Sequence, residues 1–319
     1  MNDIKIGCGV KGMYKIQVLE NGRVVEDRPW AKNMILDQGL DYALSLRLNS
    51  VPLLFRYHCL GSGTTAVSAS QTGLVTELKR TGTLVTGNCG QTIAGGTITF
   101  RYTWDHAVEG VGGANYAEHG ISPYASAGNN LFARSLISGG TVSVPEGQQL
   151  RVIYDVSVAV SPSAPSPATV GGTGWPVSPA TNCDGDAVLL YWDTVTGTLD
   201  TYGNTGGASF LTFSSFQQEC FPVSEITLPG GIGSVGAYTQ ISDSSIQYVA
   251  NAYTTGSFTR TISPTGYATA GGWSSTSIAG WHFTSAGYNA LAFKYDQKQT
   301  KANTHRLRYP SITITWARA

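Results

Sequence analysis

The stretch that most constrains the fold runs from residue 150 to residue 160, where apolar and polar residues alternate. The apolar positions are Leu150, Val152, Tyr154, Val156, Val158 and Val160, and Arg151, Asp155 and Ser157 lie between them. A period of two residues is typical of a β-strand with one face on a core and the other in water. Residues 97–104 repeat the pattern, with Ile98, Phe100, Tyr102 and Trp104 on one face. The sequence therefore predicts an antiparallel β protein.

Residues 115–160 as a whole predict a β-meander, because short strand-like segments are joined there by turns rich in Gly, Asn and Ser. Asn21-Gly22 separates two strand-like runs within 17–27, and this pair favours a two-residue type I′ hairpin turn. Further strands are predicted at 55–60, 74–80, 187–192, 198–202, 225–228, 246–252, 257–262, 277–283, 291–295 and 311–316. The expected class is all-β, with antiparallel β-sandwich or jelly-roll-like domains.

One short helix is expected in the N-terminal half. Leu36, Leu40, Leu44 and Leu48 are spaced by four residues, and Asp37 is available as a cap. Gly39 lies inside this segment and limits its length. The apolar stripe of the helix is expected to cover an open end of the sandwich.

The domain prediction depends on residues 161–180, which are rich in Pro, Ser and Gly and are typical of a linker or a long loop. Residues 1–160 are expected to form an N-terminal β-sandwich domain, and residues 181–319 a C-terminal β-sandwich domain. Within the first domain, residues 1–30 are expected to form an arm or hairpin that docks on a neighbouring molecule.

Charge and composition exclude several function classes. The chain has 20 basic and 20 acidic residues and no basic run, which argues against binding to nucleic acid or to anionic lipid. No apolar run is long enough for a membrane span, and the N-terminus has no secretory signal pattern. The five cysteines are scattered and odd in number, which favours free thiols in a protein made in a reducing cytosol.

No catalytic, cofactor-binding or metal-binding residues are predicted. The five histidines, His58, His106, His119, His282 and His305, are far apart in the sequence. Glu118 and His119 are the only adjacent acid and imidazole, but neighbours on a strand point to opposite faces. The segment 231–236 has the glycine spacing of a dinucleotide loop without the strand and helix that such a loop needs. Asn182, Asp184 and Asp186 have calcium-loop spacing without its glycine and glutamate, so a turn is favoured.

Aromatic residues in Gly/Ser-rich segments are the remaining candidates for a binding site. Trp175, Trp273 and Trp281 are placed where exposed rings could stack on the sugars of a glycan. The favoured alternative is that these rings pack on the sandwich or at a seam between subunits.

Several segments together resemble a class of tailed-bacteriophage structural proteins. Residues 30–44 contain the pattern Asn33-x-Ile35-x-x-x-Gly39-Leu40-Asp41 of that class. The further segments that carry the resemblance follow in the same order: LGSGTTAVSASQTGL (60–74), FRYTW (100–104), AEHGIS (117–122), NNLFARSLI (129–137), VPEGQQLRVIYDVSV (144–158) and the end of the chain from residue 293. These are packing and turn motifs, and the class carries no catalytic residues to transfer.

The resemblance implies a non-enzymatic structural component of a tailed-phage virion, in the tail-tip, baseplate or fibre region. Such a protein is assembled in the host cytoplasm and works as an oligomer with other virion proteins. Two alternatives remain open, a head-decoration or head-fibre protein and a carbohydrate-binding receptor module that contacts a host-surface glycan.

Overall fold

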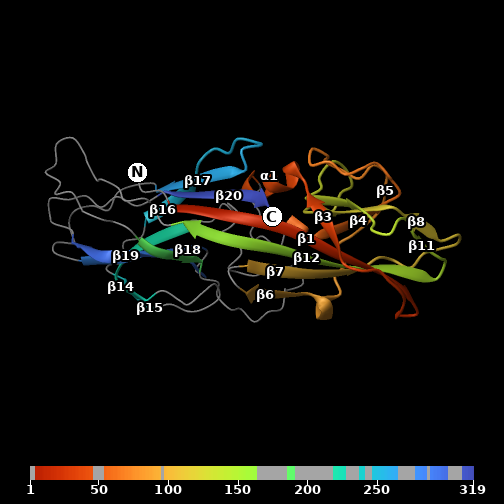
Figure 1. Cartoon of the computed structure of the whole chain (residues 1–319), viewed down its shortest axis with the longest axis horizontal. Coiled ribbons are helices and arrows are strands. Elements are labelled where there is room, and N and C mark those ends of the chain that lie inside the picture. The colour runs from red at the N-terminus through yellow and green to blue at the C-terminus, as the bar shows by residue number, and fades with distance from the viewer. Residues whose placement is uncertain are drawn as a thin grey trace.

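The computed structural model describes residues 4–45, 54–94, 97–163, 185–190, 218–227, 237–240, 246–264, 277–285, 288–300 and 311–319. Apart from one α-helix and one short 3-10 helix, the elements of this part are β-strands (Figure 1). In chain order they are β1 (Ile4–Glu20), β2 (Arg23–Asp27), β3 (Ala31–Ile35), α1 (Asp37–Ser45), β4 (Tyr57–Gly61), β5 (Glu77–Thr81), η2 (Thr86–Asn88), β6 (Gly90–Ala94), β7 (Thr97–Asp105), β8 (Ala114–Tyr116), β9 (Glu118–Ser122), β10 (Ala133–Leu136), β11 (Val142–Val144), β12 (Gln148–Ser163), β13 (Gly185–Leu190), β14 (Gln218–Thr227), β15 (Ala237–Gln240), β16 (Ile246–Ala250), β17 (Thr259–Pro264), β18 (Ser277–Ser285), β19 (Tyr288–Thr300) and β20 (Ile312–Arg318). The predicted all-β class is confirmed.

Strand β1 is the spine of the molecule. It is antiparallel to β12 along almost its whole length, from Lys5 opposite Ser163 to Glu20 opposite Gln148. Its other edge pairs in succession with β20, β3 and β2, and the β20 pairing is parallel. Figure 1 shows β1 and β12 running together through the molecule. The N-terminal segment, expected to be a docking arm, thus forms the centre of a sheet from Ile4 to Glu20, and β2 follows it at the edge.

Two sheets pack face to face. The first, here called the β1 sheet, has the order β6-β7-β12-β1, followed by the three partners on the far edge of β1. The second, the β9 sheet, has the order β5-β4-β9-β10-β3. Strand β3 pairs with β1 and with β10, so it joins the two sheets. The predicted meander over 115–160 is therefore wrong: β9 and β10 are a pair, but β12 lies in the other sheet, and β8 pairs with β11 in a separate ribbon.

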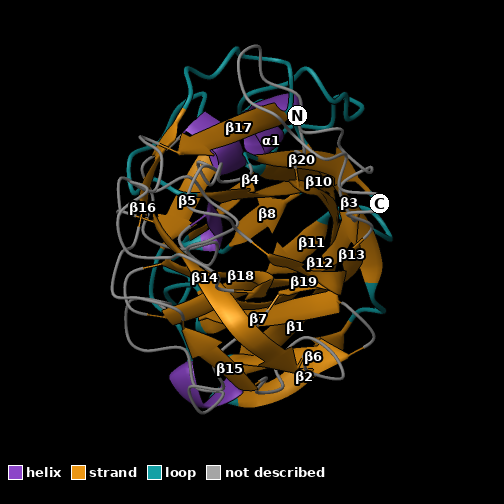
Figure 2. Cartoon of the chain, turned by 90° about the vertical axis from the view of Figure 1, so that its left-hand side faces the viewer, coloured by secondary structure: helices purple, strands orange, loops and turns teal. Residues whose placement is uncertain are grey.

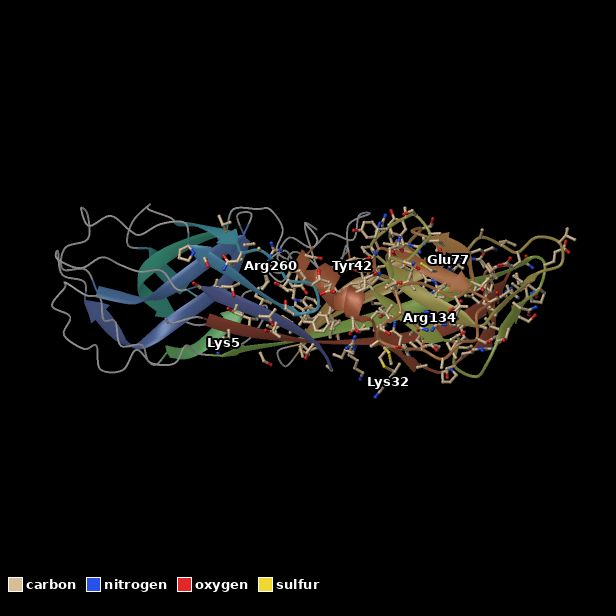
Figure 3. All side chains as sticks on the ribbon, turned by 90° about the horizontal axis from the view of Figure 1, so that it is seen from above. Lys5, Lys32, Tyr42, Glu77, Arg134 and Arg260 are labelled. Carbon is tan, nitrogen blue, oxygen red and sulfur yellow. The ribbon has the colours of Figure 1, made fainter. Side chains whose placement is uncertain are left out.

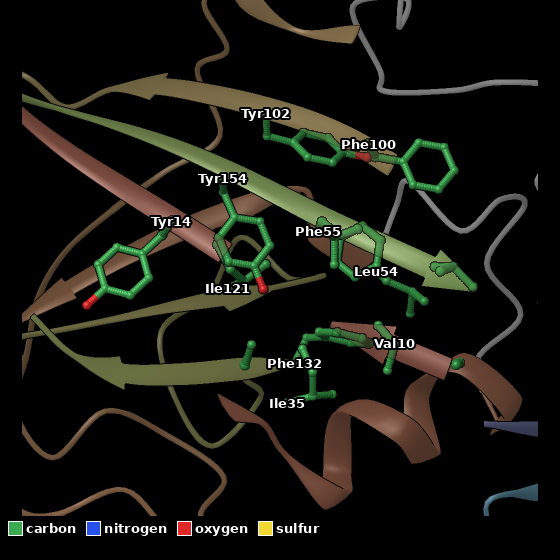
Figure 4. Close-up of a cluster of buried hydrophobic side chains, with 14 of the residues drawn as sticks. Val10, Tyr14, Ile35, Leu54, Phe55, Phe100, Tyr102, Ile121, Phe132 and Tyr154 are labelled. Carbon is green, nitrogen blue, oxygen red and sulfur yellow. The ribbon is translucent and has the colours of Figure 1, made fainter. Parts of the chain in front are cut away.

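The core between the sheets follows the predicted alternation. The apolar positions of β7 and β12 are almost fully buried, and so are Ile312, Ile314 and Trp316 of β20. Figure 4 shows Tyr14, Tyr102 and Tyr154 of the β1 sheet and Ile121 of the β9 sheet, which belong to one buried cluster. Burying such side chains contributes roughly 1.5–3 kcal/mol each.

Helix α1 forms where the leucine spacing predicts it, with Leu40, Ala43 and Leu44 buried in the same core. Gly39 is required there because a β-carbon on it would overlap the carbonyl of Phe132. Asp37 is the first helical residue rather than the cap, and its carboxylate accepts a hydrogen bond from Arg318. A negative charge in the first turn still favours the helix dipole. Leu48 lies outside the described residues.

The hairpin after β1 and most strands of the second half are confirmed. Asn21 and Gly22 have φ values of 49° and 78°, as a type I′ turn requires. Strands β13, β14 and β16 to β20 overlap the predicted segments, whereas β15 was not predicted and 198–202 lies outside the described residues. In Figure 2 the end of the molecule that carries β14, β15, β18 and β19 faces the viewer. The division into domains at 161–180 stays a prediction, because residues 164–184 are not described.

Candidate functional site: two buried polar centres on one strand

Two of the three tryptophans proposed for glycan stacking, Trp175 and Trp273, lie outside the described residues. The third, Trp281, belongs to β18, where its backbone is opposite Pro222 of β14 and Phe293 of β19. The structure therefore does not bring these three residues into one described site. No helix in the described ranges is long and apolar enough to cross a membrane.

The loop from Ser62 to Thr76 connects β4 to β5, and its two ends meet. The backbone N–H of Ser62 donates to the carbonyl of Thr76 at 3.0 Å, and Gly61 is opposite Glu77 in the ladder. A compact loop with closed ends is an Ω-loop, a type of segment that often carries function. Its exposed side chains are mainly Ser and Thr, so it presents a neutral surface.

Glu118, at the start of β9, fixes this loop from inside. Its carboxylate accepts hydrogen bonds from the backbone N–H groups of Gly63 at 3.0 Å, Val75 at 3.2 Å and Thr76 at 2.9 Å. The side chain is fully buried, so each bond replaces water that the carboxylate has lost. Burial alone would raise the pKa of Glu118, but the bonds from Thr76, Arg134 and Val75 outweigh it and lower the pKa. Glu118 is therefore a fixed negative charge.

Arg134 of β10 neutralises that charge. Its Nε donates to Glu118 Oε2 at 2.8 Å, and its Nη2 lies 2.7 Å from the same oxygen, with both side chains fully buried. The remaining donors reach the loop itself, Nη1 to Gln71 Oε1 at 2.7 Å and Nη2 to the carbonyl of Thr65 at 3.0 Å. Figure 3 labels Arg134 in the same half of the molecule as Glu77, the first residue of β5. The ion pair connects β9, β10 and both halves of the Ω-loop.

Several residues of the segments on which the sequence resemblance depends contact one another inside the fold, at Glu118 and at Tyr154. A β-carbon on Gly61 or Gly63 would collide with the Glu118 carboxylate, so both glycines are needed for the close approach. Asn33 Oδ1 accepts from Tyr154 at 3.1 Å above Gly12, where a β-carbon would also overlap. These motif residues therefore serve internal packing.

The opposite face of β9 carries a second polar centre, which is a chain of three imidazoles. His58 of β4 contacts His106 through Nδ1 and Nε2 at 2.8 Å, and its own Nε2 lies 3.2 Å from His119 Nδ1. His106 follows β7 in the β1 sheet, whereas His58 and His119 belong to the β9 sheet, so the chain links the two sheets. The ring of Tyr14 covers His119, with ring centroids 4.0 Å apart.

All three imidazoles are neutral near pH 7. Burial is the main cause, and it lowers the pKa of both His106 and His119 to about 3 and that of His58 well below its usual value. Nearby positive charge adds to the effect, from Lys79 at His106 and from Arg134 at His119. A buried imidazole that cannot hold a proton at pH 7 is a poor general acid, although it still forms hydrogen bonds.

The chain has one open end, because His119 Nε2 is buried and has no hydrogen-bond partner. Each neutral ring carries one proton, so the two bonds can run in either of two directions. We favour the direction that leaves His119 Nε2 without a proton, because an unpaired N–H costs more than an unpaired lone pair. At the other end of the chain of imidazoles, His106 is 3% exposed, whereas His58 and His119 are fully buried.

A further ion pair lies at the His106 end. Glu109 accepts from Lys79 Nζ at 2.6 Å and from the hydroxyl of Tyr116 at 2.7 Å. In the ranges that the structure describes, no group of three acidic, His or Cys side chains is arranged to hold a metal ion. The two nitrogens of His58 point to different neighbours, so the imidazoles form a line rather than converging on one point.

The sequence did not reveal the histidine chain, because His58 is 48 positions from His106 and 61 positions from His119. The available signal was that His58 and His119 each lie among apolar residues in a strand, which indicates burial. The expectation that Glu118 and His119 face opposite ways is confirmed by their separate partners. Cys8, Cys59 and Cys89 are free thiols as predicted, and Cys183 and Cys220 are not among the described side chains.

No protein-family model, curated protein or solved structure matches the chain.

Proposed function

We propose that the protein is a non-enzymatic structural component of a tailed-phage virion, in the tail-tip, baseplate or fibre region, and that it works as an oligomer. The observation that carries the proposal is the exposed strand β2 at the edge of the spine. Val24 and Val25 on this strand are 45% and 53% exposed. Unpaired strand edges with apolar side chains are sites where protein chains join.

The buried polar groups support the same proposal. Glu118 and Arg134 pair with each other and with a loop, and the three imidazoles are neutral and enclosed. This arrangement gives a rigid body rather than an accessible acid and base. The phage setting itself comes from the sequence resemblance, whose motif residues pack the fold. A head-decoration or head-fibre location remains an alternative within it.

The test is immunogold labelling of intact phage particles with an antibody to this chain, viewed by negative-stain electron microscopy. Label at the tail end supports the proposal, whereas label over the capsid moves the protein to the head. If particles from a permissive host carry no label and contain no peptide of this chain by mass spectrometry, the virion proposal is wrong.

A carbohydrate-binding role is the second candidate, and one surface favours it. Trp30 is 40% exposed, and the guanidinium of Arg101 lies 5.5 Å from its ring centroid. Arg101 also forms a two-bond ion pair with Asp155 at 2.7 and 2.6 Å, beside a hollow of about 420 Å³ that Asn88 and Thr99 also line. Sugars bind to planar polar groups next to an exposed ring.

Glycan-array binding of the purified protein tests this second role. The Trp30→Ala variant should lose binding if the ring stacks on a sugar, and the Val111→Ala variant, which changes a residue that is 93% exposed, should keep it. If binding persists in Trp30→Ala but disappears in a Trp273→Ala, Trp281→Ala double variant, the glycan binds at the tryptophans predicted from the sequence and not at Trp30.

A further inference from the structure

We propose that a hollow at the junction of β1, β3 and β20 binds an acidic segment of another protein in the assembly. A carboxylate of that segment is held between Lys11 and Lys32, and an apolar side chain next to it enters the hollow. The inference rests on the assembly role proposed above and deepens it, since it names a contact surface and the chemistry of the partner.

The hollow lies where the edge of β1 changes its partner. Strand β20 pairs with this edge as far as Val10, opposite Arg318, and β3 pairs with it from Gly12 onward. Figure 1 shows the C-terminus beside β1 and β3 at this junction. The hollow has a volume of about 380 Å³, which is within the range of ligand sites. It is lined by residues 10–12 of β1, residues 32–35 of β3, and single residues from β10, the Ω-loop and the end of β20.

The hollow carries positive charge. Four basic residues line it, and no aspartate or glutamate does. Two of the four are neutralised, since Arg134 pairs with Glu118 and Arg318 pairs with a carboxylate of α1. The other two, Lys11 and Lys32, are exposed, and their side chains have no ion-pair or hydrogen-bond partner within the described residues. The unpaired charge is therefore available to a ligand.

The two unpaired lysines are close enough to share one carboxylate. Met13 is opposite Lys32 in the ladder, and Lys11 precedes Met13 by two residues, so it is a diagonal neighbour of Lys32 on the same face. Diagonal neighbours lie about 7–8 Å apart, within reach of long side chains. Figure 3 labels Lys32 at the margin of the molecule. An anionic group between the two ammonium groups is attracted by both and relieves their mutual repulsion.

The cations elsewhere on this face of the β1 sheet have partners of their own. Lys15 pairs with Asp27, and both Arg101 and Arg151 pair with aspartates across the β7–β12 ladder. Unpaired lysines are therefore a local property of the hollow and not the general condition of the sheet. A carboxylate at Ala319, the last residue, offsets at most one of the two lysine charges, so the hollow stays positive.

An apolar part of the lining indicates what accompanies the charge. Met34 is 37% exposed, and it lines the hollow together with Val67 of the Ω-loop. An inorganic anion would leave these side chains in water, whereas an acidic protein segment with an apolar residue covers them. A membrane surface is a poorer fit, because the chain has 20 basic and 20 acidic residues and no basic run around the two lysines.

Peptide binding to the purified full chain tests this chemistry. The probe is a fluorescent hexapeptide in which aspartate and leucine alternate, and fluorescence anisotropy measures its affinity. We expect saturable binding. A peptide with asparagine in place of aspartate, or with serine in place of leucine, should bind at least about tenfold more weakly, because it lacks one of the two features that the hollow recognises.

Variants of exposed lining residues locate the binding. Lys11→Gln and Lys32→Gln should each weaken it by about threefold, since one exposed charge contributes little, and the double variant by about tenfold. Arg23→Gln is the matched control: it removes an exposed cation without a partner in the described residues, but on β2 and outside the hollow, and should leave the affinity unchanged. Met34→Ser should weaken binding of the leucine peptide and not that of the serine peptide.

Two results on the purified chain would overturn the proposal. One is binding that fails to saturate at millimolar peptide or is unchanged in the double lysine variant. The other is retention of the chain on vesicles of phosphatidylserine and phosphatidylcholine that the double variant loses, because the hollow would then bind a lipid surface.

Carbodiimide cross-linking of intact phage particles, read by mass spectrometry, tests the same contact in the assembly. The reagent activates a carboxylate, and a lysine amine in contact with it displaces the reagent as a urea and forms an amide. We expect a cross-link from Lys11 or Lys32 to an acidic residue of a different virion protein, and a link to a second copy of this chain would overturn the choice of partner. Particles that contain the chain without such a link would reject the site alone, and peptide binding by a chain that is absent from particles would reject the virion role alone.

Discussion

Glu118 and His119 are neighbours on β9, and the two polar centres they belong to are built in opposite ways. Glu118 is charged, and its carboxylate accepts four hydrogen bonds, three from backbone N–H groups of the Ω-loop and one from Arg134, with which it also forms an ion pair. His119 is neutral, and it ends a chain of three rings with one nitrogen unpaired. Both side chains are fully buried.

The difference lies in how each centre meets the cost of burial. A buried charge is tolerated when its partners replace the lost water, and removing one partner is then expensive. The imidazoles avoid the cost by remaining neutral, which leaves them sensitive to any condition that protonates them. The Glu118 centre should therefore respond to mutation, and the His119 centre to pH.

The largest expected effect is acid destabilisation through the imidazoles. In the unfolded chain each histidine takes up a proton near pH 6.5, but in the folded chain His106 and His119 do so only near pH 3. Between these values the unfolded state binds more protons, so stability falls as pH falls. With all three rings neutral, the free energy of unfolding should drop by about 4 kcal/mol per pH unit below pH 6. Urea unfolding at a series of pH values measures this slope.

The contribution of Glu118 to stability should be lost in a different pH range from that of the histidines. Its folded pKa is lowered, so the stability that it contributes is present above its unfolded pKa of 4.5 and is lost as pH falls through the folded value. Stability that stays constant from pH 6.5 to pH 5 and falls only below would contradict the histidine prediction and assign acid sensitivity to carboxylates.

The second largest effect is expected from Arg134→Met. This change keeps an apolar chain of similar length and leaves Glu118 buried without its counter-charge. Breaking a buried ion pair from one side costs about 3–5 kcal/mol. Chemical denaturation at pH 7 measures the loss, and limited proteolysis within 62–76 should become faster because the arginine also holds Thr65 and Gln71.

Arg101→Met is the matched control. Arg101 makes an ion pair with Asp155 of similar length, but its side chain is 51% exposed. Exposed pairs contribute about 0–1 kcal/mol, so this variant should be close to the unaltered chain. Equal losses in the two variants would mean that the burial of the Arg134 pair has no energetic consequence.

The sequence predicted the alternating parts of the fold because their evidence is local. The burial of Phe100 or Val156 follows from a period of two, and the Asn21-Gly22 turn follows from a preference for positive φ. The length of β1 was missed because glycines at 7, 9 and 12 interrupt its apolar pattern, and β12 pairing rather than propensity keeps that strand extended. Apolar neighbours of His58 and His119 indicate burial, but no local pattern shows that the three imidazoles meet or that Arg134 pairs with Glu118, since each contact joins strands that only the tertiary fold brings together.

The third effect separates the middle of the histidine chain from its end. His58 serves both neighbours, so His58→Phe leaves His106 Nε2 and His119 Nδ1 buried without partners. Each unsatisfied group costs about 1–3 kcal/mol, and we expect a loss of about 2–4 kcal/mol at pH 7. Thermal or urea unfolding measures it, and a loss below that of His119→Phe would show that the two contacts are not hydrogen bonds.

Among the variants of the two buried centres, the smallest effect at pH 7 is expected from His119→Phe, and its value lies in the pH slope. One nitrogen of His119 is already unpaired, so the change removes one orphan while creating another at His58 Nε2. The stability at pH 7 should therefore change by about 1 kcal/mol or less. The variant has one fewer neutral imidazole, so its acid slope should fall by about one third, because each ring contributes equally to the proton difference. An unchanged slope would mean that His119 takes up its proton in the folded chain as readily as in the unfolded one. That result would place the acid sensitivity on His58 and His106 alone, and it would make the open nitrogen of His119 a proton acceptor rather than an unmet cost of folding.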